Sequence, residues 1–312
     1  MVRSDPLSAT NSNDALRIST EVADALHDGR PVVALESTIF STLGLPAPAN
    51  ADALRLCLAA VRAGGCVPAL TCVLDGVARV GVDPKDYDRV LCGNTKVAER
   101  DLPVAIARGL EVGVTTVSAS LALAAVVGIS VLATGGIGGV HRDDHLTGDV
   151  SADLGALARY RVLCVCAGAK AFLDLAKTLE LLDTLGVPVL GYGTNRFPAF
   201  YVRDSGWPVP HRVDTPKEAA AVLRARFALG LPGGVLVANP IPESAELPAH
   251  EIDVALTAAI TDAAAAGLRG AAVTPFILDR IGQATAGRSV PANLALAEAN
   301  ARLAAEIAAA LS

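Results

Sequence analysis

The sequence predicts an α/β fold with three layers, in which helices cover both faces of a mixed, largely parallel sheet. Short apolar runs typical of buried strands alternate along the 312 residues with longer amphipathic segments. Hydrophobic residues make up 52% of the chain and aromatic residues only 4%, which suits helices packed on a buried sheet. Asp75-Gly76 separates two apolar runs and predicts a hairpin turn, so at least one strand pair is expected to be antiparallel.

The N-terminal half contains most of the predicted strands. Asp28-Gly29 ends the first predicted helix, and Leu54, Cys57 and Val61 form the apolar face of the second. The expected elements are a helix at 15–27, a strand at 31–36, a helix at 51–63, strands at 67–74 and 77–80, a helical run around 101–103, a strand at 112–117, a helix at 118–127 and a strand at 129–133.

The C-terminal half is expected to become mainly helical. The elements are a strand at 162–168, a helix at 171–185, a strand at 187–191, an irregular Pro/aromatic segment at 197–209, a helix at 217–229, a strand at 234–239, and helices at 251–266, 275–285 and 291–310. No internal repeat is visible. We expect a single domain over residues 15–312, preceded by a disordered polar tail, residues 1–14.

Composition excludes several classes of partner. The net charge is −6 without a long basic run, so a nucleic-acid polymer is not an expected partner. The longest nearly apolar run, 121–133, is shorter than the ~20 residues that span a bilayer, and no signal peptide precedes it. We therefore expect a soluble, cytoplasmic protein. Its six cysteines form no C-x-x-C pair and are expected to be buried free thiols.

Polar side chains lie at or just past the ends of four predicted strands: Glu36, Thr134, Lys170 and Asn239. In open α/β sheets, ligands collect at the carboxyl ends of the strands. This pattern predicts an active site at that edge of the sheet.

A glycine-rich stretch, Gly135-Gly-Ile-Gly-Gly139, follows one of these strand ends. It lacks the G-x-G-x-x-G spacing of a dinucleotide site and the Gly-Lys-Ser/Thr of a P-loop. Glycines allow a backbone to approach a ligand closely, and they also form tight turns. Both interpretations remain open for this loop.

A helix start follows the glycine loop. Ser151 is a candidate N-cap, and the free N–H groups behind it would favour an anion, although Asp153 in the first turn is also typical of simple capping. Asp149, in the preceding loop, could offer oxygen ligands to Mg²⁺ or Mn²⁺. A lone carboxylate cannot enclose a metal, so waters and substrate would supply the other ligands.

Four further charged residues have two interpretations each. Lys170 follows an apolar run that would lower its pKa and free the amine to attack a carbonyl, or it extends to solvent at a helix start. Glu36 could be a general acid with a raised pKa, or a turn cap. Lys96 could pair with a phosphate or lie on the surface, and His141 could donate a hydrogen bond or serve structure.

Read together, these segments resemble the pseudouridine-5′-phosphate glycosidase family, which includes the IndA-like proteins. The matching segments follow one another from about residue 16 to 311, nearly the whole chain. They are Ala34-Leu-Glu-Ser-Thr-Ile39, Asn94-Thr-Lys96, Gly113-Val-Thr-Thr-Val117, Ala133-Thr-Gly-Gly-Ile-Gly-Gly-Val-His-Arg142, Asp149-Val-Ser-Ala-Asp-Leu154, Cys166-Ala-Gly-Ala-Lys170, Gly191-Tyr-Gly-Thr194, Pro198-Ala-Phe200, Val237-Ala-Asn-Pro-Ile-Pro242, Thr274-Pro-Phe276 and Asn293.

The resemblance implies reversible cleavage of pseudouridine 5′-phosphate to uracil and ribose 5-phosphate. The bond broken is a C–C glycosidic bond, so protonating a leaving-group oxygen cannot assist as it does in ordinary glycosidases. In the family a lysine attacks C1′ of the sugar, the ring opens, and an iminium serves as the electron sink.

Carried over by position, Lys170 is this nucleophile, Glu36 is the proton donor, and Asp149 holds a Mn²⁺-type ion. The sugar-phosphate site is lined by Lys96, Val117, Ser151, Ala152 and Asp153. Asn293 is expected to face uracil, and His141 and Thr134 to line the pocket. The family forms trimers, so the resemblance also implies a homotrimer.

One segment departs from the family pattern. Where the family has Ser-His-Gly-Met-Pro, this chain has Ser41-Thr-Leu-Gly-Leu-Pro46, without the histidine and one residue longer. The change affects the shape of the pocket and its substrate preference, while the predicted nucleophile and metal ligand are kept. Two alternatives remain: a Schiff-base lyase or aldolase acting on another sugar phosphate, and a non-catalytic sugar-phosphate binding protein. A mere binding protein would not need the whole set of Glu36, Lys96, Asp149 and Lys170.

Overall fold

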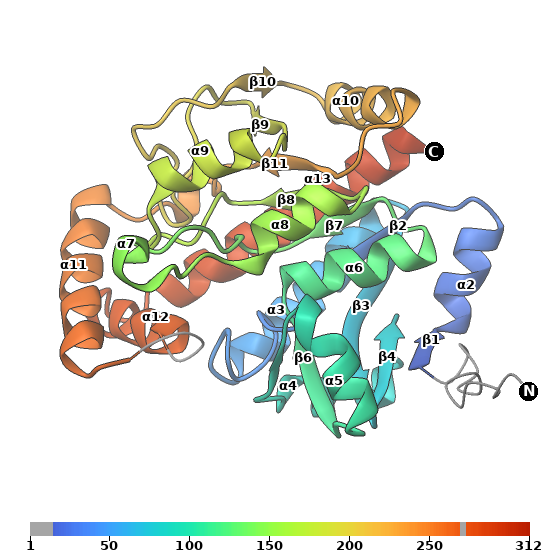
Figure 1. The fold of residues 1–312 in the computed structure, drawn as a ribbon, viewed down its shortest axis with the longest axis horizontal. Helices are drawn as coiled ribbons and strands as arrows, with labels where there is room; N and C mark the ends of the chain where they lie inside the picture. Colours follow the sequence, from blue (N-terminus) through green and yellow to red (C-terminus); the bar gives the residue numbers. More distant parts are fainter. Residues whose placement is uncertain (1–14, 269–272) are drawn as a thin grey trace, which may run out of the picture.

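The computed structural model describes residues 15–268 and 273–312, so the predicted tail lies outside the described residues. The described strands form one sheet (Figure 1). Its order is β1 (Leu16–Ile18), β4 (Val77–Val80), β3 (Val67–Leu74), β2 (Val32–Leu35), β7 (Val131–Ala133), β8 (Leu163–Cys166), β11 (Val235–Ala238), β9 (Val189–Tyr192) and β10 (His211–Val213). Off this path, β5 (Lys96–Val97) pairs with β6 (Val112–Thr115), and β6 pairs with β3.

The sheet is mixed and largely parallel, as the sequence predicts. The neighbours from β3 through β2, β7, β8, β11 and β9 to β10 pair in parallel. Strand β3 pairs in antiparallel fashion with β4 and with β6. The β3–β4 hairpin turns at Asp75 and Gly76, which have φ angles of 52° and 72°. Positive φ at both central residues matches the right-handed twist of the strands, which explains the Asp-Gly pair.

Helices cover both faces of the sheet (Figure 1). On one face lie α6 (Val117–Val127), α8 (Ala152–Arg159) and α9 (Leu175–Thr184); on the other lie α3 (Ala49–Ala63), α10 (Pro216–Ala228) and α13 (Ser289–Leu311). The helices α11 (Ala249–Ala265) and α12 (Val273–Ala284) pack together at one end of the molecule, beyond the short α7 (Asp144–Thr147). The remaining helices are α2 (Thr20–His27), α4 (Tyr87–Leu91) and α5 (Leu102–Ala107), with short 3₁₀ turns at 84–86, 99–101 and 243–245.

The core lies in the central strands. Every residue of β2, β3, β8 and β11 is buried, because helices cover both faces of these strands. Parallel strands covered in this way read as continuous apolar runs, which explains why they could be recognised in the sequence. Within the part of the chain that the structure describes, no helix has the length and apolar character needed to span a bilayer.

Several predicted boundaries were wrong. Residues 16–18 form an edge strand on β4 and not the start of a helix; α2 begins after Ser19, whose Oγ accepts a hydrogen bond from Val22 N at 3.4 Å. Residues 171–174 form a turn, because Asp174 caps α9 by accepting from Lys177 N at 3.0 Å. The short elements β5, β10 and α7 were not predicted. Cys92 is exposed, whereas the other cysteines are buried, and all six are free.

Candidate active site

The polar residues at the strand ends meet at one edge of the sheet. The strands β2, β7, β8 and β11 are consecutive parallel neighbours, so their carboxyl ends lie together. Glu36, Thr134 and Asn239 directly follow three of them, and Lys170 lies just beyond the fourth. The prediction that these residues converge is confirmed.

The glycine loop runs beside the segment that carries Lys170. Ala167 N donates to Gly135 O at 2.9 Å, and Lys170 N donates to Ile137 O at 3.1 Å. The loop is buried, so these bonds hold it as a rigid wall beside Lys170. Gly168 has φ +82°, and a Cβ there would lie 2.1 Å from Pro198 O. Only glycine allows the chain to reach the position of Lys170 by this path.

Two cavities adjoin at this edge and share Glu36, Thr38 and Lys170. The larger has a volume of about 490 Å³ and the smaller about 50 Å³. The lining of the larger cavity includes Lys96, Arg100, Val117, His141, Asp149, Ser151, Ala152, Asp153 and Phe172. The smaller cavity is mainly apolar and includes Asn293. Glu36 and Lys170 therefore lie where a polar and an apolar part of one ligand would join.

Glu36 is the buried carboxyl group of the site, with 6% of its surface exposed. Burial raises its pKa to about 6, although the Lys170 charge and a hydrogen bond from Thr134 Oγ1 oppose this rise. Within the described structure, Thr134 lines neither cavity. Its contact is with Glu36, so it supports the carboxyl group from below the pocket. A carboxyl group with this pKa can hold a proton near neutral pH.

One part of the larger cavity carries groups that favour a bound anion. Burial and the nearby charge of Lys170 lower the pKa of Lys96, although Lys96 as a whole residue remains exposed. The N-termini of α6, at Val117, and of α8, at Ala152, also line the cavity. Helix N-termini carry free N–H groups and a partial positive charge. A bound phosphate would relieve the repulsion between the two lysines.

Asp153 connects the segments that line the larger cavity by hydrogen bonds. Its Oδ1 accepts a hydrogen bond from Ser118 N at 2.9 Å, and its Oδ2 accepts one from Gly138 N at 2.8 Å. The carboxylate thus joins α8 to α6 and to the glycine loop. A Cβ at Gly138 would lie 2.2 Å from Ser151 Oγ, so this approach also requires glycine. Asp153 borders the cavity, and both of its oxygens already bind the protein.

Replacing Asp153 by asparagine is expected to lower the free energy of unfolding by about 1–3 kcal/mol. The amide keeps one acceptor and presents its NH₂ group to the other backbone N–H, which is left buried without a partner. Urea unfolding followed by circular dichroism measures the change. Glu180→Gln, an exposed substitution within α9, is the control and should change stability by less than ~0.5 kcal/mol. Equal stability of the two variants would contradict this supporting role for Asp153.

Asp149 lies on the loop before α8, beside His141. Its Oδ2 is 3.8 Å from His141 Nε2, and 37% of its side chain is exposed. The His141 ring lies 5.9 Å from the Phe172 ring, which helps to orient it. Within residues 15–268 and 273–312, no three His, Cys, Asp or Glu side chains cluster as a metal cage. The donor set fits a hard cation held by one carboxylate together with waters and ligand oxygens, which is a mode typical of Mg²⁺.

The smaller cavity carries an oriented amide. Asn293 Nδ2 donates to Tyr201 Oη at 3.0 Å, and burial raises the pKa of the Tyr201 phenol, which stays protonated. The apolar lining is Ile39, Leu43, Leu45, Phe200 and Leu278. The segment that departs from the family pattern thus contributes Leu43 to this cavity, while Thr42 Oγ1 donates to Gly93 O at 2.8 Å. The departure lies at the apolar part of the site.

Some site residues were missed by sequence reasoning. Thr38, which lines both cavities, lies inside the Glu-Ser-Thr-Ile segment and could have been found there. Arg100 and Phe172 had no local signal, because they reach the cavity only through the packing of distant segments. Asn300 was also missed: its Nδ2 donates to Thr134 O at 2.8 Å, and its Oδ1 accepts from Asn239 at 3.0 Å. Asn300 therefore anchors α13 to the start of the glycine loop, and Asn239 holds the Asn300 amide from the end of β11.

Known structures share the whole fold. The prealnumycin C-glycosynthase AlnA, crystallised in complex with ribulose 5-phosphate, is 36% identical with a TM-score of 0.87, covering 95% of this chain and 97% of its own. An indigoidine synthase A-like protein from Thermotoga maritima is 34% identical with a TM-score of 0.86, covering 96% and 98%. The three-layer α/β/α class is thereby confirmed.

Curated relatives are closer in sequence. A protein from Rhodospirillum centenum is 55% identical over 297 residues, covering 95% of this chain and 92% of its own. One from Methylobacterium nodulans is 52% identical over 298 residues, covering 95% and 88%. Both are named pseudouridine-5′-phosphate glycosidase. Residues 21–310 match the model of the family described as indigoidine synthase A like protein. This confirms the resemblance inferred from the motifs: the chain belongs to the indigoidine synthase A like protein family.

Proposed function

We propose that this protein is a pseudouridine-5′-phosphate glycosidase that reversibly cleaves pseudouridine 5′-phosphate into uracil and ribose 5-phosphate. The observation that carries the proposal is the place of Lys170 and Glu36 on the wall shared by the two cavities. The sugar phosphate is placed in the larger cavity, where Lys96 and two helix N-termini lie, and the base toward the smaller, mainly apolar one. The reacting bond then lies between an amine and a protonated carboxyl group. The names of the relatives support this substrate.

Lys170 is proposed to supply the electrons for bond cleavage. Its amine attacks C1′ of the sugar and the ring opens, so that the ring oxygen becomes a hydroxyl. The nitrogen lone pair then forms a C=N bond as the C–C bond breaks, and the bond electrons pass to the uracil carbon. Glu36 gives its proton to that carbon. Water hydrolyses the iminium, which releases ribose 5-phosphate and restores the amine.

The other residues are proposed to bind and orient the substrate. The Lys96 amine and the N-termini at Val117 and at Ser151–Asp153 receive the phosphate, where His141 also faces the ligand. Asn293 offers its amide to the polar edge of uracil, with the orientation set by Tyr201. Thr134 acts through Glu36. We also propose a homotrimer, which light scattering after size-exclusion chromatography would test.

Asp149 is proposed to hold a divalent cation such as Mn²⁺ together with waters and oxygens of the substrate. When bound, the ion would neutralise negative charge on the substrate. The proposal rests on the exposed carboxylate at the wall of the anion-binding cavity. His141, within 3.8 Å, is a second possible ligand once its ring moves closer.

Replacing Asp149 by asparagine is expected to weaken Mn²⁺ binding by about tenfold or more, because it removes the one proposed anionic ligand. Titration of Mn²⁺ followed by electron paramagnetic resonance, with ribose 5-phosphate present, measures the affinity directly. Asp143→Asn removes one charge from the same loop and is the matched control, with an expected change below twofold. Equal Mn²⁺ affinity in wild type and Asp149→Asn would overturn the metal assignment.

The substrate is tested by incubating the protein with uracil, ribose 5-phosphate and Mn²⁺, and by detecting pseudouridine 5′-phosphate with mass spectrometry. Synthesis and breakdown of this compound are the expected results. If neither occurs while Lys170 still forms a borohydride-trapped adduct with ribose 5-phosphate, a Schiff-base lyase acting on another sugar phosphate becomes the better assignment. If the sugar phosphate binds without any adduct, the protein is a non-catalytic binding protein.

A further inference from the structure

The loop between the glycine loop and α8 forms an exposed strap, residues 141–149. Its base is pinned, because His141 N donates to Asp149 O at 3.1 Å. Its tip hardly touches the body: all residues from 142 to 148 are exposed except Asp144, and Leu146 is 79% exposed. The strap nevertheless carries His141 and Asp149, two residues of the proposed site.

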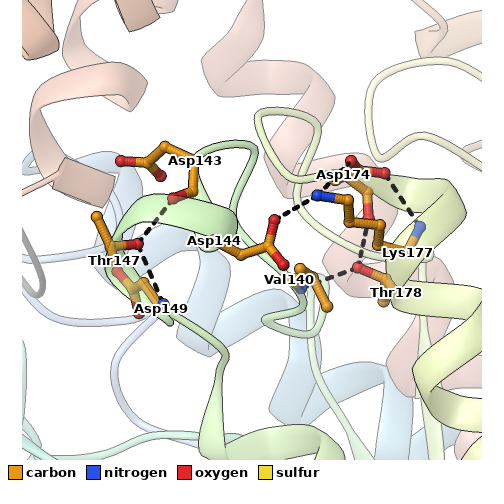
Figure 2. Close-up of polar contacts among 8 residues, drawn as sticks. All are labelled: Val140, Asp143, Asp144, Thr147, Asp149, Asp174, Lys177 and Thr178. Atoms are coloured by element: carbon orange, nitrogen blue, oxygen red, sulfur yellow. Dashed lines mark hydrogen bonds and ion pairs between the residues drawn. The ribbon is translucent and has the colours of Figure 1, made fainter.

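A chain of polar contacts connects Asp149 to the tip of the strap (Figure 2). Asp149 N donates to Thr147 Oγ1 at 3.1 Å, and Thr147 Oγ1 donates to Asp143 O at 3.1 Å. These bonds attach Asp149 to α7. Asp144, in the first turn of α7, then pairs with the Lys177 amine on α9. Within the described residues, this is the ion pair that joins the strap to another element.

The far end of this chain leads to the segment that carries Lys170. Leu173 N donates to Lys170 O at 3.0 Å, and Asp174 N donates to Val140 O at 2.9 Å. Asp174 in turn caps α9 by accepting from Lys177 N at 3.0 Å, and its Oδ2 lies 3.9 Å from the Lys177 amine. These hydrogen bonds fix the start of α9, and with it Lys177, relative to the segment that carries the proposed nucleophile Lys170.

The strap has room to move away from the site. A cavity of about 630 Å³ separates it from α11 and α12, with Leu146, Ile260, Leu268 and Ile277 in its lining. An ion pair whose partners are 45% and 24% exposed is a weak link that thermal motion breaks and reforms. We therefore expect the strap to exchange between a paired form and an open form.

We propose that the Asp144–Lys177 ion pair is a latch that positions Asp149 over the ligand cavity, with Lys177 and Asp144 acting as positioning residues. This inference rests on the proposed sugar-phosphate site. In the paired form, Asp149 is held opposite the segment of Lys170 before substrate arrives. When the ion pair is absent, the strap takes up more positions, and the ligand binds only the fraction of molecules in which Asp149 lies over the cavity. The apparent affinity falls in proportion to that fraction.

Replacing Lys177 by alanine is expected to raise KM for pseudouridine 5′-phosphate by about two- to fivefold and to leave kcat within about twofold, a size typical of exposed ion pairs. Lys177→Arg keeps the charge and should restore the wild-type KM. Asp144→Asn should match Lys177→Ala, and the double variant should show no further change. In the Asp149→Asn background, Lys177→Ala should have no effect on KM, because the residue that the latch positions is gone.

Two measurements separate this proposal from the proposed function. Calorimetric titration with ribose 5-phosphate in the presence of Mn²⁺ reports affinity without turnover and should show the same two- to fivefold weakening. Hydrogen exchange of amides 143–149 should be faster in Lys177→Ala. Arg62→Ala is the matched control, because Arg62 joins α3 to Glu21 of α2 at 2.5 Å and is 52% exposed. If the wild type does not cleave pseudouridine 5′-phosphate but Lys177→Ala still binds ribose 5-phosphate more weakly than the wild type, only the proposed substrate is overturned. Unchanged affinity in Lys177→Ala, or an equal loss in the Asp149→Asn background, would overturn the latch.

Discussion

Lys170→Ala is expected to lower kcat for cleavage of pseudouridine 5′-phosphate on the order of 10³-fold or more, because it removes the amine proposed to supply the bond-forming electron pair. The amine lies beside a buried carboxyl group, and its backbone is held by Ile137 O and reached through Gly168. The two backbone features, the bond to Ile137 O and the approach through Gly168, do not depend on the lysine side chain. The variant should therefore remain folded, and its defect should be chemical.

Borohydride trapping measures the covalent step itself. The wild type incubated with ribose 5-phosphate and reduced should gain one sugar phosphate, and peptide mass spectrometry should place it on Lys170. The Lys170→Ala variant should gain none. Lys96→Ala is the matched control, since it removes an amine from the same cavity; it should raise KM and keep the adduct. An adduct that persists in Lys170→Ala would assign the nucleophile elsewhere.

Thiols offer no alternative nucleophile in the strand below. Cys164 and Cys166 are buried in β8, and burial raises the pKa of the Cys166 thiol to about 12. Such a thiol is protonated at neutral pH and is not a nucleophile. Lys170 is therefore the group in this segment that fits covalent attack.

Glu36→Gln is expected to lower kcat by 10²–10⁴-fold, the usual contribution of a positioned general acid. The wild-type pH profile should reflect the pKa of Glu36 of about 6. The donor must be protonated for cleavage, so kcat/KM should fall as pH rises above about 6. The residual activity of Glu36→Gln should lack this limb. A limb that persists in the variant would assign the titrating group to another residue.

The same pKa predicts an effect on stability. The folded-state pKa of about 6 exceeds the ordinary value of 4.5, so the folded protein holds the proton more tightly than the unfolded chain. The stabilising contribution of Glu36 is therefore complete below about pH 4.5 and is lost as pH rises through 6. Relative to wild type, Glu36→Gln should gain up to about 2 kcal/mol between pH 4.5 and pH 8, measured by urea unfolding. A difference that does not vary with pH would contradict the raised pKa.

The sheet class and the location of the site could be predicted because both leave local patterns. Strands buried on both faces must be apolar throughout, as Leu163–Cys166 is, and their ends are marked where polar residues such as Glu36 begin. The Asp75-Gly76 pair marked the hairpin for the same local reason. Where structure depends on a distant partner, prediction failed. Residues 16–18 form a strand because β4 lies beside them, and nothing within the segment required it.

The sequence by itself determined the alternation of strands and helices, the polar residues at the strand ends and the family of the chain. Only the tertiary structure decided what those residues touch. It showed that both oxygens of Asp153 accept hydrogen bonds from backbone N–H groups and that Thr134 donates to Glu36. It also showed that the glycine loop is a rigid wall. The physical reason is that burial and hydrogen-bond partners arise between segments far apart in the chain. A raised carboxyl pKa or a strap held by Lys177 exists only after those segments have packed together.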